Sequence, residues 1–172
     1  QKGMDTVKSK HSISDIGKIK PELKSSELLV RINPVYEKTK DEIEQVIEQG
    51  ADIIMLPYFK TVEEVQKFIK YVKGRCKTML LVETPEAVEK IDDILNVEGI
   101  DEVHIGLNDL HLGYKKKFMF ELLTDGTVEF LCKKFKEHNI TSYGFGGISK
   151  IGTGDLPAEN ILIEHYRLGS KA

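Results

Sequence analysis

Two acidic residues, Glu83 and Asp109, each lie just beyond a short apolar segment with the composition of a β-strand. Glu83 follows the run 78–82, and Asp109 belongs to the segment 106–110 that follows the run 103–105. Carboxylates that leave neighbouring parallel strands in the same direction project into the crevice at the strand ends, where α/β enzymes build their sites. Because an oxygen-only pair suits Mg²⁺ or Mn²⁺ better than zinc, the sequence predicts a divalent-metal enzyme site. The alternative is that both acids are helix caps or solvated loop residues.

The elements that would position these acids form a repeated strand–helix pattern. Apolar runs predict strands, and apolar residues at helical spacing predict helices. The expected strands are 28–33, 52–56, 78–83, 102–106 and 141–145, and the expected helices are 37–49, 61–72, 85–95, 124–138 and 157–168. The first four strands begin 24, 26 and 24 residues apart, which is the step of consecutive βα units and predicts a parallel sheet. Continuous apolar strands indicate that both faces of this sheet are covered.

The fold class that accommodates this pattern is α/β, and we predict a (β/α)8 TIM barrel. A complete barrel takes about 250 residues, whereas this chain has 172 residues. Residues 1–23 contain no convincing strand and are expected to form a polar loop and a short helix that begins at Ser12 or Ser14. Residues 169–172 have the composition of the entry to a further strand. We therefore expect a single domain, residues 1–172, that is an incomplete barrel with its early strands and last strand missing.

The composition is that of an ordinary soluble globular protein, with 40% hydrophobic and 31% charged residues. The net charge of −3 is spread along the sequence without a basic stripe, so nucleic acid is not an expected partner. No apolar run approaches the roughly 18 residues of a membrane span, so no membrane is expected. Cys76 and Cys132 form no Cys-x-x-Cys pair, which favours reduced thiols and a cytoplasmic location.

Four segments of the chain carry a resemblance to a known family. They are VRINP at 30–34, GADIIMLP at 50–57, VETPEAV at 82–88 and HIGLNDL at 104–110. In this order they resemble the HpcH/HpaI aldolase and citrate lyase beta-subunit family, closely over residues 27–112 and more loosely beyond. The resemblance implies a barrel of the phosphoenolpyruvate/pyruvate type.

Members of this family hold Mg²⁺ or Mn²⁺ through one glutamate and one aspartate, and the resemblance assigns these roles to Glu83 and Asp109. A 2-oxo acid such as pyruvate or oxaloacetate is expected on that metal. Arg31 matches the arginine that grips the oxo acid, and backbone N–H groups of Leu107, Asn108 and Asp109 are expected to bind the substrate carboxylate. A guanidinium pairs bidentately with a carboxylate, and an arginine inside an apolar strand is costly without a partner. The alternative for Arg31 is an ordinary structural ion pair.

The general base is expected to be a histidine. His11 with Asp15 four residues later resembles in outline the base motif of the aldolase branch, and the alternative is a loop histidine that caps a helix. His104 alternates with apolar neighbours, which favours a packed barrel residue over a ligand. His111 follows the Asp109 segment, and contact with substrate and a solvent-exposed loop are both open for it.

These observations predict a metal-dependent carbon–carbon lyase of the aldolase type. It would act on a 2-oxo acid or acyl substrate through a Mg²⁺-stabilised enolate, with Arg31 as the carboxylate anchor and His11 as the base. Two alternatives stay open: a non-catalytic barrel or binding module in a biosynthetic cluster, and a phosphate-binding isomerase-type barrel that uses the glycines between residues 144 and 154. Because open barrel edges have to be covered, a homo-oligomer is expected.

Overall fold

The computed structural model describes residues 11–150, 152–154 and 156–171, and its strands form one parallel sheet. In their order across the sheet the strands are β1 (Leu29–Arg31), β2 (Ile53–Leu56), β3 (Lys77–Val82), β4 (Glu102–Ile105) and β5 (Ser142–Phe145). Each strand pairs with the next one along the chain, as Val30 does with Ile54 and Leu80 with Val103. Sequential parallel pairing is the construction of a (β/α) barrel wall, so the predicted α/β class and the parallel sheet are confirmed.

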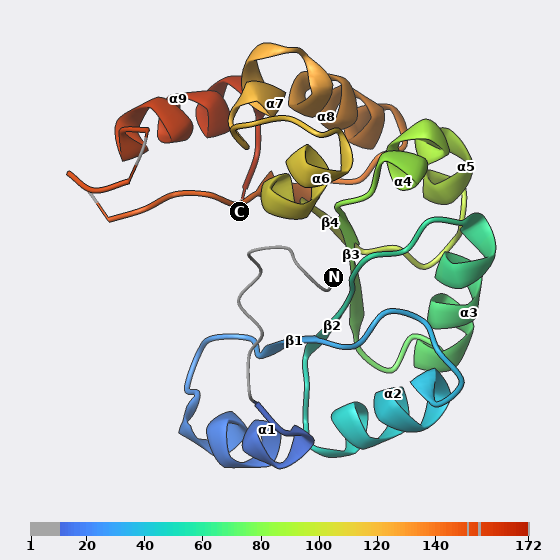
Figure 1. Cartoon of the computed structure of the whole chain (residues 1–172). Helices are drawn as coiled ribbons and strands as arrows, with labels where there is room; N and C mark the ends of the chain where they lie inside the picture. Colours follow the sequence, from blue (N-terminus) through green and yellow to red (C-terminus); the bar gives the residue numbers. More distant parts are fainter. Residues whose placement is uncertain (1–10, 151, 155, 172) are drawn as a thin grey trace.

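Helices surround the outer side of this sheet in an arc (Figure 1). They are α1 (Ile13–Ile19), the 3-10 helix η1 (Lys20–Glu22), α2 (Thr39–Glu48), α3 (Val62–Val72), α4 (Pro85–Glu89), α5 (Ile91–Leu95), α6 (Leu107–Gly113), α7 (Glu121–Thr124), α8 (Thr127–Glu137) and α9 (Ala158–Leu168). The arc is open on one side, as expected of a barrel with an incomplete wall (Figure 1). Within the described ranges no helix is long and apolar enough to cross a membrane.

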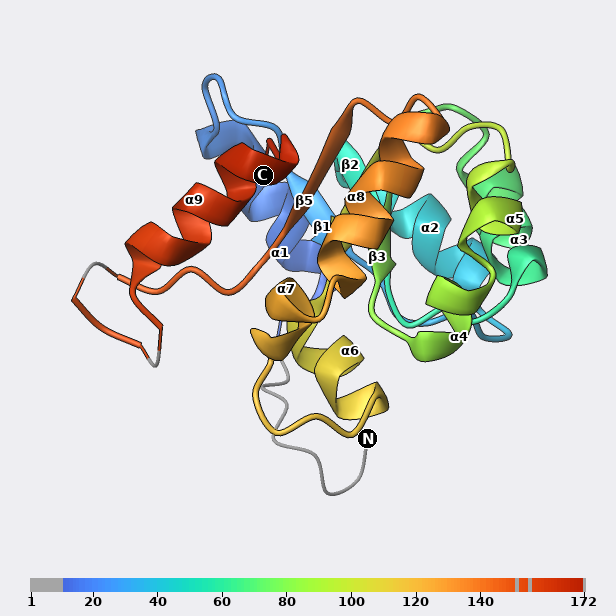
Figure 2. The ribbon, with the colours of Figure 1, turned by 90° about the horizontal axis from the view of Figure 1, so that it is seen from above.

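Two expected segments differ from the structure. The helix expected over 85–95 is two short helices, because Lys90 leaves the helical conformation with φ −106° and ψ 18° and separates α4 from α5. The stretch between β4 and α8 is not a plain loop, since it contains α6 and α7 beyond the strand ends (Figure 2). In both places the helices have only four to seven residues, which is too short to show a clear apolar period.

Two strands are preceded by the same local motif, in which a glycine with left-handed backbone lies two residues before an aspartate. Gly50 and Gly99 both have φ +95°. The Asp52 carboxylate accepts the Leu28 N–H at 2.7 Å, and the Asp101 carboxylate accepts the Thr78 N–H at 2.8 Å. Each aspartate therefore joins the start of its own strand to the start of the preceding one. This repeated link sets the register that brings the carboxyl ends of the strands to one edge.

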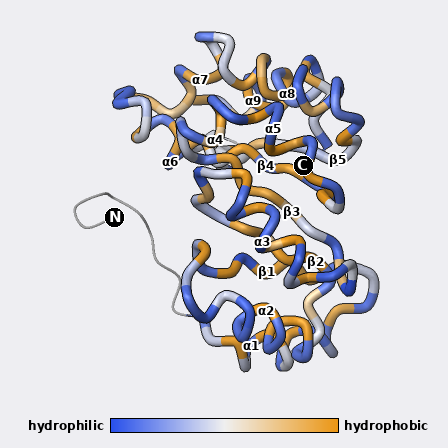
Figure 3. The backbone as a smooth tube through the Cα atoms, turned by 90° about the vertical axis from the view of Figure 1, so that its right-hand side faces the viewer, coloured by the Kyte–Doolittle hydropathy of each residue, from blue (hydrophilic) through white to orange (hydrophobic). Residues whose placement is uncertain are grey.

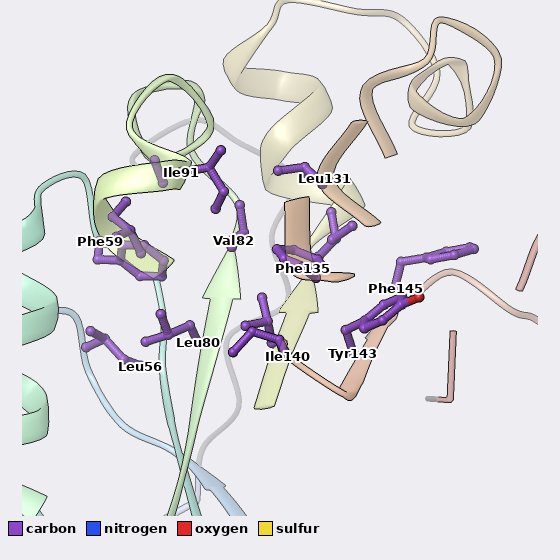
Figure 4. Close-up of a cluster of buried hydrophobic side chains, with 14 of the residues drawn as sticks. Leu56, Phe59, Leu80, Val82, Ile91, Leu131, Phe135, Ile140, Tyr143 and Phe145 are labelled. Carbon is purple, nitrogen blue, oxygen red and sulfur yellow. The ribbon is translucent and has the colours of Figure 1, made fainter. Parts of the chain in front are cut away.

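Both faces of the central strands are buried. On the outer face Leu56, Leu80 and Val82 pack against helical residues such as Phe135 (Figure 4). On the inner face a separate cluster contains Ile53, Met55, Met79 and Leu81. Figure 3 shows the corresponding concentration of hydrophobic residues along the middle strands. The prediction that both faces are covered is confirmed for β2 and β3.

Strand β1 is not covered on both faces, so the prediction of a buried strand is wrong there. Leu29 is 39% exposed, and Arg31 at the end of the strand is also exposed. In the described sheet β1 pairs on one side only, with β2, so its side chains lack a second neighbour. An apolar run alone does not distinguish such an edge strand from a central one.

Candidate active site

Glu83 lies at the carboxyl end of β3, and the residue is only 6% exposed. It continues the inward-facing alternation of Met79 and Leu81, because successive strand residues point to opposite faces. The chain turns directly into α4, whose N-cap is Thr84, with Pro85 in the first turn. Glu83 Oε1 accepts the backbone N–H of Tyr58 at 3.0 Å. Glu83 is therefore neither the cap of α4 nor a solvated loop acid.

Asp109 lies in the first turn of α6, directly after β4. The N-cap of this helix is Gly106, so Asp109 is not the cap either. Its Oδ1 atom is buried and has no hydrogen-bond partner among the residues that the structure describes. A buried carboxylate oxygen without a donor is costly unless a ligand satisfies it.

The two carboxylates lie close enough to interact. Burial and, next, the negative charge of Asp109 raise the pKa of Glu83 to about 7, although the Tyr58 N–H and the positive charge of Arg31 oppose the rise. A cavity of about 340 Å³ adjoins the pair and is lined by both acids together with Tyr58, Lys60 and Pro85. The predicted convergence of Glu83 and Asp109 is present in the fold.

The chemistry of this pair fits a hard divalent cation. Both side chains offer oxygen only, one oxygen is unsatisfied, and two like charges are brought together in a buried place. In the described part of the chain no group of three or more His, Cys, Asp or Glu side chains could hold an ion. Mg²⁺ and Mn²⁺ accept one or two protein carboxylates and complete their coordination with water and substrate, whereas structural zinc needs a fuller set of ligands. The cation itself stays a prediction.

Arg31 lies at the carboxyl end of β1 and pairs in register with Met55, so its side chain is on the inner face of the sheet. It is exposed, which corrects the expectation of a costly arginine inside an apolar strand. No ion pair or hydrogen bond joins it to another residue in the described ranges. The alternative of a structural ion pair therefore finds no support there. The guanidinium is available to a ligand near Glu83.

Leu107, Asn108 and Asp109 form the first turn of α6, as the expected N–H donors require. The first N–H groups of a helix have no partner inside it and point beyond its N-terminus. The first bond of this helix runs from the Leu110 N–H to the Gly106 carbonyl at 3.1 Å. The structure thus places the three residues at the start of the helix whose N-cap, Gly106, adjoins Glu83. Contact of their N–H groups with substrate stays a prediction.

His11 is exposed and directly precedes Ser12, the N-cap of α1. Asp15, which completed the expected motif, accepts the Ser12 N–H at 2.8 Å and pairs with Lys18 at 3.0 Å. The aspartate therefore caps α1, and its partners account for its low pKa. No described contact brings His11 to Glu83, Asp109 or Arg31, so its role as base stays a prediction.

Two further histidines, His104 and His111, lie on elements next to the site. His104 is half-buried on β4, and burial lowers its pKa, as expected of a packed residue. His111 is 9% exposed inside α6, and its Nδ1 lies 3.3 Å from the Leu107 carbonyl. The alternative of a solvent-exposed loop for His111 is wrong, because the segment that follows Asp109 is helical.

The burial of His165 predicts that the fold loses stability at acidic pH. It is 8% exposed and stacked on Phe145 at 3.8 Å, and burial lowers its pKa. A histidine with a lowered native pKa contributes stability above its unfolded pKa, which is about 6.5, and this contribution is lost as the pH falls below that value. We expect the free energy of unfolding in urea to fall between pH 7.5 and 5.5, and to fall less in His165→Phe. An equal fall in both proteins would contradict this assignment.

Several residues that line the cavity were not predicted, among them Tyr58 and Lys60. Both follow Pro57, which predicts only the end of the strand. Tyr58 has φ +52°, and Lys60 pairs with Glu86 at 2.7 Å. Proline followed by an aromatic residue at the carboxyl end of a buried strand was the available signal.

Comparison with known proteins bears on this arrangement. The sequence profile of the HpcH/HpaI aldolase/citrate lyase family matches residues 10–128. No curated protein sequence gives a significant match.

Several solved structures have a similar fold. An HpcH/HpaI aldolase from Desulfitobacterium hafniense DCB-2 is similar with a TM-score of 0.74 and 18% identity, over 93% of this chain and 70% of that one. An HpcH/HpaI aldolase/citrate lyase family protein from Burkholderia cenocepacia J2315 has a TM-score of 0.73 and 13% identity, over 92% and 72%. The citrate synthase SbnG has a TM-score of 0.71 and 18% identity, over 95% and 71%. At these identities the likeness shows the fold.

Proposed function

The chain belongs to the HpcH/HpaI aldolase/citrate lyase family, and on this premise we propose that it is a divalent-metal-dependent carbon–carbon lyase for a 2-oxo acid or an acyl substrate. The observation that carries the proposal is the pair of the buried Glu83 and the partly buried Asp109, whose buried Oδ1 atom has no described partner. Two like charges brought together out of water are stabilised by a cation between them. The cavity beside the pair offers room for a small substrate.

The residues around the pair would bind the carboxylate of the substrate. When bound, Mg²⁺ or Mn²⁺ supplies a Lewis acid for the carbonyl oxygen of the substrate. Arg31 binds the substrate carboxylate, because its guanidinium lies on the inner face and is free of ion pairs with described residues. The N–H groups of Leu107, Asn108 and Asp109 bind the same carboxylate from the other side, as helix N-termini bind anions.

Cleavage also needs a proton acceptor, and we assign that role to His11. It accepts the proton of the substrate hydroxyl while the carbon–carbon bond breaks, and the electron pair of that bond stays on the 2-oxo acid fragment. Return of the proton to the carbon of that fragment completes the reaction. His11 is exposed directly before α1, so its imidazole is open to a substrate hydroxyl.

Metal removal tests the function directly. We expect chelation with EDTA to lower the release of pyruvate from a 4-hydroxy-2-oxo acid at least about 100-fold, and excess Mg²⁺ or Mn²⁺ to restore it. Titration calorimetry with Mn²⁺ alone should show one site for each chain. Undiminished turnover after chelation would overturn the metal-dependent mechanism. Failure to take up Mn²⁺ or a 2-oxo acid would favour the non-catalytic binding module instead.

The same assay separates the two flanking residues. Arg31→Lys should raise the KM for the oxo acid, because lysine cannot reproduce the bidentate contact. His11→Gln should lower kcat while the affinity for Mn²⁺ stays unchanged. The reverse pattern, a lowered kcat in Arg31→Lys alone and no effect of His11→Gln, would remove His11 from the mechanism.

We also propose that the protein works as a homo-oligomer in the cytoplasm. In the described sheet β1 and β5 each pair on one side only. The outer face of α9 carries Leu162, Ile163 and Tyr166, which are 51%, 62% and 90% exposed. Apolar surface next to open sheet edges is typical of subunit interfaces. Light scattering in solution measures the number of subunits, and a monomer at all concentrations contradicts the proposal.

A further inference from the structure

The loop that follows β2 is bonded residue by residue to the segment that follows β3. The Tyr58 N–H donates to Glu83 Oε1 at 3.0 Å. The Thr84 hydroxyl donates to the Phe59 carbonyl at 2.7 Å in a buried contact. Finally, the Lys60 ammonium donates to Glu86 Oε1 at 2.7 Å. Three consecutive residues of one loop thus hold the stretch that carries Glu83.

The backbone of Tyr58 is in a conformation that tyrosine rarely adopts, with φ +52°. The described ranges contain three other non-glycine residues with positive φ, Lys73, Lys115 and Asn139. Lys73 is the C-cap of α3, and the other two come directly after the C-caps of α6 and α8. Left-handed residues commonly end helices.

No helix ends at Tyr58, because it follows the strand β2 and Pro57. Helix termination therefore does not account for its conformation. A left-handed non-glycine residue is strained and persists where the surroundings require it, often at functional sites. The contact made here is the one between the Tyr58 N–H and the Glu83 carboxylate.

The two oxygens of Glu83 have different surroundings. Oε1 receives the Tyr58 N–H. Oε2 lies on the side of Gly106, since a Cβ built on that glycine would be 2.8 Å from Oε2. Gly106 is the N-cap of α6, the helix that carries Asp109. The hydrogen bond from Tyr58 therefore fixes the carboxylate with its second oxygen directed towards α6.

We propose that Tyr58 is a positioning residue for the cation site, and that it acts through its left-handed backbone and not through its ring. The backbone N–H holds Oε1 and keeps Oε2 in place to share a divalent cation with Asp109. This inference rests on the proposed function, because it assumes that the pair binds a cation. The proposal assigns Tyr58 a role in which its side-chain chemistry is irrelevant. The effect of a substitution at position 58 on cation affinity should therefore depend on how readily the new residue adopts positive φ.

Three variants test the proposal through their affinity for Mn²⁺, measured by calorimetry without substrate. Tyr58→Gly adopts positive φ without strain, and Tyr58→Phe keeps the size of the ring, so both should bind Mn²⁺ within about threefold of the wild type. Tyr58→Val is disfavoured at positive φ, and we expect it to bind Mn²⁺ about tenfold more weakly and to lose kcat with little change in KM. If Tyr58→Gly loses affinity while Tyr58→Phe keeps it, the ring and not the backbone is responsible, and the proposal is wrong.

Lys73→Val is the matched control for backbone strain. It places the same β-branched residue at φ +55°, at the end of α3 and outside the cavity lining. It should lower the unfolding temperature as Tyr58→Val does and leave the affinity for Mn²⁺ unchanged. A similar loss of affinity in both variants would show a general effect of instability and overturn the proposal.

A readout without metal separates this inference from the proposed function. The Tyr58 amide should exchange slowly with solvent in the wild type, and faster in Glu83→Ala, which removes the acceptor. Slow exchange with wild-type Mn²⁺ affinity in Tyr58→Val would overturn the positioning role and leave the lyase proposal standing. Absence of Mn²⁺ uptake by the wild type would overturn both proposals, even if the amide exchange shows that the hydrogen bond exists.

Discussion

Glu83→Gln is expected to reduce turnover about 1,000-fold and to leave the unfolding temperature equal to that of the wild type or higher. Glutamine keeps the shape of the side chain and an oxygen that accepts the Tyr58 N–H, but it removes the charge that would hold a cation. Burial and the charge of Asp109 already oppose that charge, since together they raise the pKa of Glu83 to about 7. The new amide can donate to the buried Asp109 Oδ1, which has no described donor. Turnover of a 4-hydroxy-2-oxo acid and thermal unfolding without metal measure the two effects.

The matched control for this variant is Glu63→Gln. Glu63 occupies the first turn of α3, after the neighbouring strand, and it is exposed. The same chemical change there should alter turnover by less than about twofold, because exposed charges contribute little. Wild-type turnover in Glu83→Gln would end the proposed mechanism. A large drop in its unfolding temperature would show that the carboxylate is structural instead.

The pair at the centre of the site could be predicted because parallel βα units leave few choices. Strand starts 24 to 26 residues apart require adjacent parallel strands, and adjacent parallel strands end at one edge. This geometry predicts that Glu83 and Asp109 lie at the same edge of the sheet. Thr84 and Pro85, which start the next helix, support the prediction for Glu83. The observed bounds of β3 and β4 differ from the expected ones by one residue at each end at most.

Other parts of the site depend on tertiary contacts that leave no local signal. The positive φ of Tyr58 exists because Glu83 lies 25 positions further along the chain and within hydrogen-bond distance. The exposure of Arg31 depends on how many strands flank β1, which the residues of β1 do not reveal. From the sequence, Asp15 could either act beside His11 or cap α1. In the structure it caps α1, because Ser12 and Asp15 satisfy each other's backbone donors.

A second large loss of activity is expected from substitution of Gly106, although this residue has no side chain that could take part in the reaction. A Cβ at this position would lie 2.8 Å from both Cβ and Oε2 of Glu83 and 3.3 Å from Leu81 Cδ1. The backbone itself is unstrained, with φ −85° and ψ 84°, so alanine acts through contact alone. Glu83 cannot retreat freely, because Tyr58 holds its other oxygen.

We therefore expect Gly106→Ala to displace the carboxylate and to lower kcat about 100-fold, since a shift of about 1 Å in a catalytic group has this effect. Its affinity for Mn²⁺ should fall as well. Gly146→Ala is the matched control, because Gly146 follows β5 as Gly106 follows β4, and its added Cβ would meet only His104 Nε2 at 3.6 Å. The control should keep activity within about threefold. The opposite outcome, a loss in Gly146→Ala with Gly106→Ala intact, would move the site to the glycines after β5 and favour phosphate binding over cation binding.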